Sequence, residues 1–220
     1  DEHYADRLDL LMDLSVALNK EYHALADAGA PMVQIEEPAI HQVIADPNQK
    51  IKPEQWVEAF NVEVKGLRDK CEVWCHTCWG SPAAQRVASK DQSYKAALPY
   101  LNELDCDVQT VEGAFNQGMD LEHFGKMISK DKKVALGVIS HRTLQVERPE
   151  EVADLIRKAL KHIEPERLIL TSDCGFGRQG MSRMHAFYKM VALTRGTNIV
   201  RKELGLPEAD IPATDPKLSM

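Results

Sequence analysis

His76 and Cys78, an imidazole and a thiol two residues apart, are the side chains of this sequence best suited to binding a metal ion. They lie in residues 72–80, where aromatic and β-branched residues predict a short buried strand that a glycine ends. Successive side chains of a strand point to opposite faces, so we expect both groups on one face and Cys75 on the other. Together they could provide two of the four ligands of a Zn²⁺ ion.

Core packing is the simpler interpretation of a single His-x-Cys pair, because cysteine is among the residue types most often buried. A metal site needs further ligands from elsewhere in the chain. Glu112 and Cys174 are suitable candidates, since a carboxylate and a second thiolate would complete a four-coordinate set for Zn²⁺.

The composition is that of an ordinary globular protein, with 220 residues, of which 44% are hydrophobic and 28% are charged. A net charge of −7 and the lack of a lysine- and arginine-rich run argue against a nucleic acid or an anionic membrane as partner. No apolar run approaches the roughly 18 residues of a membrane span, and no signal sequence is evident, so we expect a cytoplasmic location. The five cysteines are then better interpreted as thiols and metal ligands than as disulfides.

Helical and strand patterns alternate along the chain, which predicts parallel β/α units in a single domain of the α/β class, residues 1–220. Each connection is long enough for a crossover between parallel strands. The expected strands are residues 32–36, 72–80, 107–113, 133–139 and 167–172. The expected helices are residues 5–28, a stretch from residue 53, and residues 94–104, 121–128, 149–163 and 184–204.

The candidate reactive residues all follow the ends of predicted strands. The carboxyl ends of parallel strands meet at one edge of a sheet, which is where barrels and doubly wound sheets place their sites. We therefore expect these side chains to lie close together. They are Glu36 and Glu37 after the first strand, His76 and Cys78 in the second, Glu112 after the third, His141 after the fourth and Cys174 after the fifth.

Four segments carry a resemblance to a known family: Gln34-Ile-Glu-Glu-Pro-Ala, His76-Thr-Cys, Asp105-Cys-Asp-Val-Gln-Thr-Val-Glu and Ser172-Asp-Cys-Gly-Phe-Gly. They resemble the catalytic barrel of the cobalamin-independent methionine synthases and their shorter relatives, over residues 5–205. The resemblance implies a (β/α)8 TIM barrel of which this chain carries about the last five units. An open five-stranded sheet would expose its edges, so a second polypeptide or a missing N-terminal segment is expected to complete the barrel.

The same resemblance implies a zinc site and its chemistry. It assigns His76, Cys78, Glu112 and Cys174 as the ligands of Zn²⁺. It also implies alkylation of a small-molecule thiol, with homocysteine taking a methyl group from a methyl-tetrahydrofolate or another methyl donor to give methionine. Zn²⁺ deprotonates a bound thiol, which can then attack an alkyl carbon as a thiolate.

Two positions depart from the family pattern. Glu36 stands where the full-length synthases have an Asp that binds the amino group of homocysteine, and its longer side chain would move that amine by about 1.5 Å. Glu37 is expected to support it by hydrogen bonding. The family's proton-donating histidine corresponds to Arg142 by counting, or to His141 after a one-residue loop adjustment, which makes His141 the candidate general acid.

Two alternative functions stay open at this point. The Glu36 change favours an enzyme that transfers an alkyl group from an epoxide or a methyl-corrinoid to coenzyme M. A non-catalytic, zinc-stabilised domain is the other alternative, and its closed four-ligand site would have no exchangeable position. Displacement of one ligand by a thiol would separate an enzyme from a structural domain.

Overall fold

The computed structural model describes residues 3–36, 39–45, 48, 50–80, 92–177, 180–210 and 212 of the chain. Five parallel strands form one sheet in this part of the chain, and each strand pairs with the next one in the sequence. This order confirms the predicted α/β class and its parallel β/α units. The strands are β1 (Met32–Glu36), β2 (Glu72–His76), β3 (Val108–Val111), β4 (Lys133–Ile139) and β5 (Leu168–Ser172).

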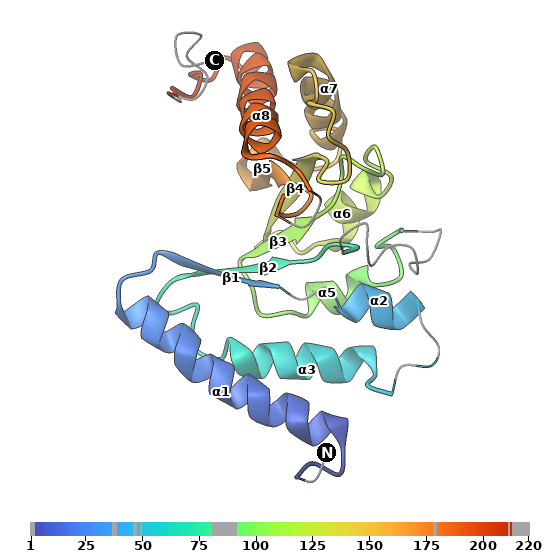
Figure 1. Cartoon of the computed structure of the whole chain (residues 1–220), viewed down its shortest axis with the longest axis vertical. Helices are drawn as coiled ribbons and strands as arrows, with labels where there is room; N and C mark the ends of the chain where they lie inside the picture. Colours follow the sequence, from blue (N-terminus) through green and yellow to red (C-terminus); the bar gives the residue numbers. More distant parts are fainter. Residues whose placement is uncertain are drawn as a thin grey trace.

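Helices occupy the connections between these strands. In Figure 1, α1 and α3 lie beside the β1 and β2 end of the sheet, and α7 and α8 lie at the β4 and β5 end. The sheet therefore runs between two pairs of helices. The elements are α1 (Arg7–Asp27), α2 (Ala39–Ala45), α3 (Pro53–Glu63), α5 (Leu98–Asn102), α6 (Leu121–Met127), α7 (Pro149–Ala159), the 3₁₀ turn η1 (Pro165–Arg167) and α8 (Arg183–Glu203).

The middle of the sheet is its most deeply buried part. All four residues of β3 and six of the seven residues of β4 are buried. Every residue of β5 is only half-buried, and β1 alternates between buried and more exposed positions. Buried central strands between two incompletely covered edge strands are expected of a sheet that forms part of a barrel.

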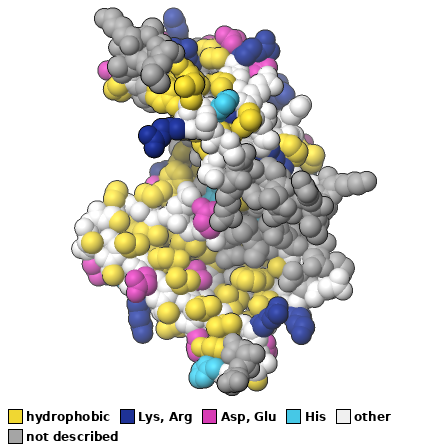
Figure 2. Space-filling view, viewed as in Figure 1, with side chains coloured by type: hydrophobic (Ala, Val, Ile, Leu, Met, Phe, Trp, Pro, Cys, Tyr) yellow, Lys and Arg dark blue, Asp and Glu magenta, His cyan; other side chains and the backbone are white. Residues whose placement is uncertain are grey.

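Apolar side chains also reach the surface of the molecule. Leu14, Val16 and Leu25 of α1 are about half exposed, and Figure 2 shows apolar atoms gathered over this part of the face. The same view shows a hollow between the part that carries α7 and α8 and the part that carries α1 and α3. Contiguous apolar surface is typical of a face that another segment or chain covers. No helix within the described residues combines the length and the apolar character needed to cross a membrane.

Three local features differ from the sequence prediction. The sequence predicts no helix at α2, because seven residues are too few to show a helical period. The helix predicted over residues 94–104 is regular only in α5, since Pro99 lacks the N–H that a helix beginning earlier would need. β2 ends at His76, so Cys78 lies in the segment beyond the strand and not within it.

Candidate metal centre

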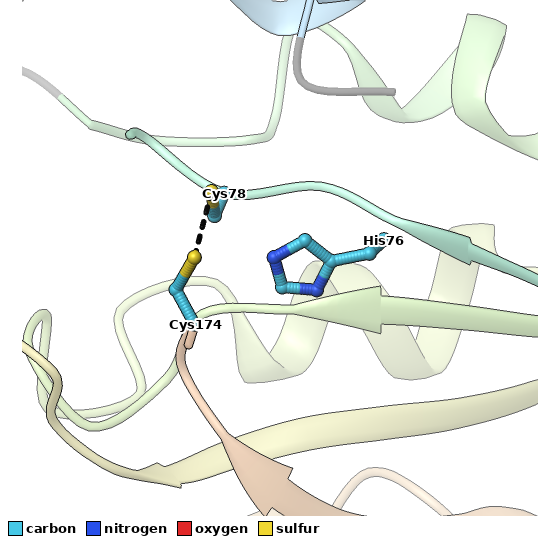
Figure 3. Close-up of side chains that lie close together, drawn as sticks. All are labelled: His76, Cys78 and Cys174. Carbon is cyan, nitrogen blue, oxygen red and sulfur yellow. Dashed lines mark hydrogen bonds between the residues drawn. The ribbon is translucent and has the colours of Figure 1, made fainter. Parts of the chain in front are cut away.

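Three side chains that could bind a metal ion meet beyond the carboxyl ends of β2 and β5. His76 is the last residue of β2, Cys78 lies two residues further on, and Cys174 lies two residues after β5 ends. Their ligand atoms all lie within 4.8 Å of one another, and the two sulfur atoms are 3.4 Å apart. In Figure 3 the imidazole points toward the two sulfurs. The structure thus brings together three of the four side chains predicted to be ligands.

Hydrogen bonding fixes the orientation and the tautomer of His76. Its Nδ1 lies 2.8 Å from Oγ1 of Thr110, and that hydroxyl donates its one proton to the carbonyl of Cys75. In the neutral ring this arrangement puts the proton on Nδ1, and Nε2 then has the lone pair that a metal ion could bind. Nε2 is buried, with the Glu36 carboxylate 3.7 Å away. A buried lone pair beside two sulfur atoms fits a Zn²⁺ ion.

The two thiols differ strongly in acidity. A hydrogen bond with Cys78, together with the neighbouring His76, holds the pKa of Cys174 well below its usual range. The same hydrogen bond and burial raise the pKa of Cys78. The pair therefore favours negative charge on Cys174, and the thiolate is the form of cysteine that binds metal ions.

Glu112, the fourth predicted ligand, lies at the same edge of the sheet but outside the group of three. The Trp79 amide donates to its Oε1 at 2.8 Å, and Nη2 of Arg142 donates to its Oε2 at 2.5 Å. Burial raises the pKa of Glu112 to about 7, against the opposing effect of the Arg142 charge. Because the protein itself holds both carboxylate oxygens, the role of Glu112 as a ligand stays a prediction.

His141, the predicted general acid, follows β4 and is fully buried. Its Nε2 lies 3.1 Å from the carbonyl of Gly80, at the end of the segment that carries Cys78. Burial lowers the pKa of His141, so the ring is neutral near pH 7. The structure therefore places His141 against the segment that carries Cys78, while the next residue, Arg142, reaches Glu112.

Glu36 and Glu37 are the residues predicted to bind the substrate. Glu36 lies opposite His76 in the register of β1 and β2, and its side chain is 59% exposed. Its Oε1 accepts a hydrogen bond from Gln34 at 3.0 Å. A largely exposed carboxylate beside His76 is open to a ligand, although its substrate role stays a prediction. Glu37 lies outside the described residues.

Asp173 supports the centre, although no pattern of residue types in the sequence singles it out. Its buried carboxylate accepts hydrogen bonds from three consecutive amides, residues 113–115, each at 2.9 Å. These bonds attach the loop that carries Cys174 to the end of β3. The carboxylate fits only because residue 137 is a glycine, where a Cβ would lie 2.2 Å from its Oδ1.

Tyr94 and His41 also hold the centre in place. The hydroxyl of Tyr94 donates to the carbonyl of Thr77 at 3.1 Å and accepts from the amide of Glu112 at 3.3 Å. Nε2 of His41 lies 2.9 Å from the carbonyl of Cys78, and burial lowers the pKa of His41 to about 4. Sequence reasoning missed both roles, because His41 lies in the unpredicted α2 and Tyr94 reads only as a helix residue.

Comparison with known proteins identifies similar sequences. The family model described as the catalytic domain of cobalamin-independent synthases matches residues 2–195. The chain is 36% identical over 204 residues to a methionine synthase of Saccharolobus islandicus, and 32% identical over 203 residues to one of Thermococcus kodakarensis. Both alignments cover 92% of this chain, but only 54% and 53% of the relatives. The chain therefore spans about half the length of these curated relatives.

Solved structures give the same picture. A B12-independent methionine synthase from Shewanella sp. W3-18-1, determined in complex with selenomethionine, superposes with a TM-score of 0.79 at 31% identity, over 93% of this chain and 58% of that one. A solved structure from Listeria monocytogenes gives a TM-score of 0.60 at 19% identity, over 90% and 57% of the two chains, which shows similarity of fold alone. These matches confirm the predicted barrel-type fold, with five parallel strands of it in the described residues.

Proposed function

The chain belongs to the cobalamin-independent synthase catalytic-domain family, and from this premise we propose that it carries the zinc site of a thiol methyltransferase that converts homocysteine to methionine. One observation carries the proposal. His76, Cys78 and Cys174, which come from distant parts of the sequence, present one nitrogen and two sulfur atoms within 4.8 Å of one another. Buried groups of this chemistry are suited to Zn²⁺, and we propose Glu112 as the additional ligand.

The residues of the chain prepare the site before any substrate arrives. Thr110 holds the lone pair of His76 Nε2 toward the two sulfurs, and the acidic thiol of Cys174 supplies negative charge. Asp173 fixes the loop that places this thiol. A Zn²⁺ ion bound there would lower the pKa of a coordinated substrate thiol, which would then react as a thiolate.

We assign the substrate contacts to the rim of the site. The exposed carboxylate of Glu36 would pair with the ammonium group of homocysteine, with Glu37 as its hydrogen-bonding support. His141 would protonate the leaving group of the methyl donor, for which a methyl-tetrahydrofolate is proposed. Burial disfavours the charged form of His141, so a proton that reaches this ring is readily passed on.

The proposed enzyme is larger than the part described by this structure. The edges at β1 and β5 are incompletely covered, and the curated relatives are about twice as long as the matched region. We therefore propose that residues 1–220 form a single domain, the C-terminal portion of a barrel that a further segment or a second polypeptide completes. We also propose a cytoplasmic location, in keeping with the thiol chemistry of the site.

Zinc X-ray absorption on the purified protein, with and without an added thiol, tests this function. The expected shell has two sulfurs and N/O ligands, and it gains a third sulfur when homocysteine is added. Cys174→Ser should remove one sulfur. Cys106 is a buried core thiol two residues before β3, and Cys106→Ser should leave the shell unchanged.

Other results would select another function or none. A third sulfur that appears only with coenzyme M would replace the homocysteine reaction by alkyl transfer to that thiol. A shell that ignores every thiol would make the zinc structural, and a protein that binds no zinc would end the proposal.

A further inference from the structure

The ion pair between Glu112 and Arg142 lies against the proposed zinc site. Both side chains are buried, with 1% and 6% of their surfaces exposed, and Oε2 of Glu112 lies 2.5 Å from Nη2 of Arg142. The Trp79 amide holds the other carboxylate oxygen. Charge-assisted hydrogen bonds are strong where water is excluded, so Glu112 cannot turn toward another cation without weakening this pair.

Two further contacts keep the guanidinium of Arg142 on Glu112. Nη1 donates to Oε1 of Gln92 at 2.7 Å, and the central carbon lies 4.0 Å from the ring centre of Phe115. The Phe115 side chain is half exposed, so the stacked ring leads from the buried pair toward solvent. Nε of Arg142 has no hydrogen-bond partner among the described residues. The two terminal nitrogens of the guanidinium are thus held by Gln92 and Glu112, and the group could move toward solvent along the Phe115 ring.

We propose that Arg142 competes with the metal ion for Glu112 and thereby sets the zinc affinity of the site. With Arg142 on the carboxylate, a metal ion has His76, Cys78 and Cys174 as ligands. When Arg142 withdraws, Glu112 can supply an oxygen as well. This inference rests on the proposed function, because it requires that the group of three binds zinc.

Competition for one carboxylate has an energetic signature. Without Arg142, the buried charge of Glu112 has lost its counter-charge, which is costly, and a divalent ion nearby relieves that cost. Removal of Arg142 should therefore strengthen metal binding, although it removes a contact. Removal of the Glu112 charge should weaken metal binding. The two effects must be non-additive, because both act through the same carboxylate.

A double-mutant cycle on zinc affinity tests the proposal. The dissociation constant for Zn²⁺ is measured by competition with a chromophoric chelator, for wild type, Arg142→Gln, Glu112→Gln and the double variant. Arg142→Gln should bind zinc about 10- to 100-fold more tightly, the range that one charge-assisted hydrogen bond corresponds to. In the Glu112→Gln background the same change should have no effect. Arg68→Gln is the matched control, since Arg68 pairs with Asp105 and Asp107 near the start of β3, away from the site.

Each outcome decides between the possibilities. Equal or weaker zinc binding by Arg142→Gln overturns the proposal, and so does equal tightening in the Glu112→Gln background, which would mean charge repulsion alone. If circular dichroism shows Arg142→Gln unfolded, Gln92→Ala takes its place, because it loosens Arg142 and keeps its charge. It should tighten binding about 2- to 5-fold, less than the loss of a whole hydrogen bond to a charged group because Arg142 keeps its contact with Glu112, and an unchanged constant overturns the proposal. A wild-type protein that binds no zinc overturns the proposed function together with this inference.

Discussion

Lys189 forms a buried ion pair that supports the loop next to the proposed zinc site, and its substitution tests how much this pair contributes to stability. Its side chain on α8 is fully buried, and Nζ lies 2.9 and 3.0 Å from the two carboxylate oxygens of Glu147 and 2.6 Å from the carbonyl of Gln145. Glu147 also accepts the amide of Ser140 at 3.0 Å. This one ammonium group therefore fixes the loop after β4 that carries His141.

The expected effect of Lys189→Met follows from burial. Methionine retains an apolar chain of similar length but leaves Glu147, whose side chain is only 16% exposed, without its counter-charge. Breaking a buried pair in this way costs about 3–5 kcal/mol of unfolding free energy. Lys70→Met is the matched control, because Lys70 and Asp27 are 2.6 Å apart but 38% and 62% exposed. A pair exposed to that degree contributes about 0–1 kcal/mol, although the atoms are closer.

Urea unfolding followed by circular dichroism measures both variants. The double variant Lys189→Met/Glu147→Gln should recover a large part of the loss, because the amide carries no charge and can still accept the Ser140 N–H. The reasoning would be refuted if Lys189→Met were no more destabilising than Lys70→Met. It would also fail if the double variant were as unstable as Lys189→Met alone.

Three further predictions concern the site and the core. Cys174→Ser should lose zinc affinity and the proposed methyl transfer while circular dichroism shows the fold intact, and full activity without metal would contradict the proposed mechanism. Gly137→Ala should destabilise by about 1–3 kcal/mol in urea unfolding, because the new Cβ would lie 2.2 Å from Asp173 Oδ1 and 2.7 Å from its Cα, whereas Gly175→Ala meets nothing within 4 Å and should have little effect. Burial raises the pKa of Glu63 above 4.5, so the folded protein binds that proton more tightly than the unfolded chain and loses stability as the pH rises above this value. Glu63→Gln lacks this loss, so its stability relative to wild type should grow from pH 4 to pH 7, and a pH-independent difference would contradict the assignment.

The sequence predicts most of the fold because its strands and long helices carry strong local signals. Residues 32–36 and 133–139 read as strands and are β1 and β4, and the helix expected from Pro149 begins there as α7. The elements that the sequence does not predict correctly are those with a weak local pattern. α2 is too short to show a period, and no pattern distinguishes a strand that ends at His76 from one that continues to Cys78.

The site was predictable to the extent that it follows from topology. Parallel strands bring their carboxyl ends to one edge, which is why His76, Cys78 and Cys174 could be expected together before any coordinates. The contact between Glu112 and Arg142 could not, because it depends on the path of a loop and joins residues 30 positions apart. Hydrogen bonds from loop amides, such as those to Asp173, leave no pattern of residue types either.

The short distance between the two sulfur atoms has a mechanical meaning for the whole sheet. Cys78 and Cys174 follow β2 and β5, which β3 and β4 separate, and three steps of about 4.8 Å would set them about 14 Å apart in a flat sheet. The sulfurs are 3.4 Å apart and join positions 96 residues apart in the sequence. A metal ion at this point would cross-link the ends of β2 and β5 and so hold four strands in a curved sheet. Metal binding and curvature of the sheet stabilise each other, because the ion binds only when the ends of β2 and β5 are close together. Any substitution that flattens the sheet should therefore weaken metal binding, even at a distance from the site, so zinc affinity reports on the curvature of the sheet.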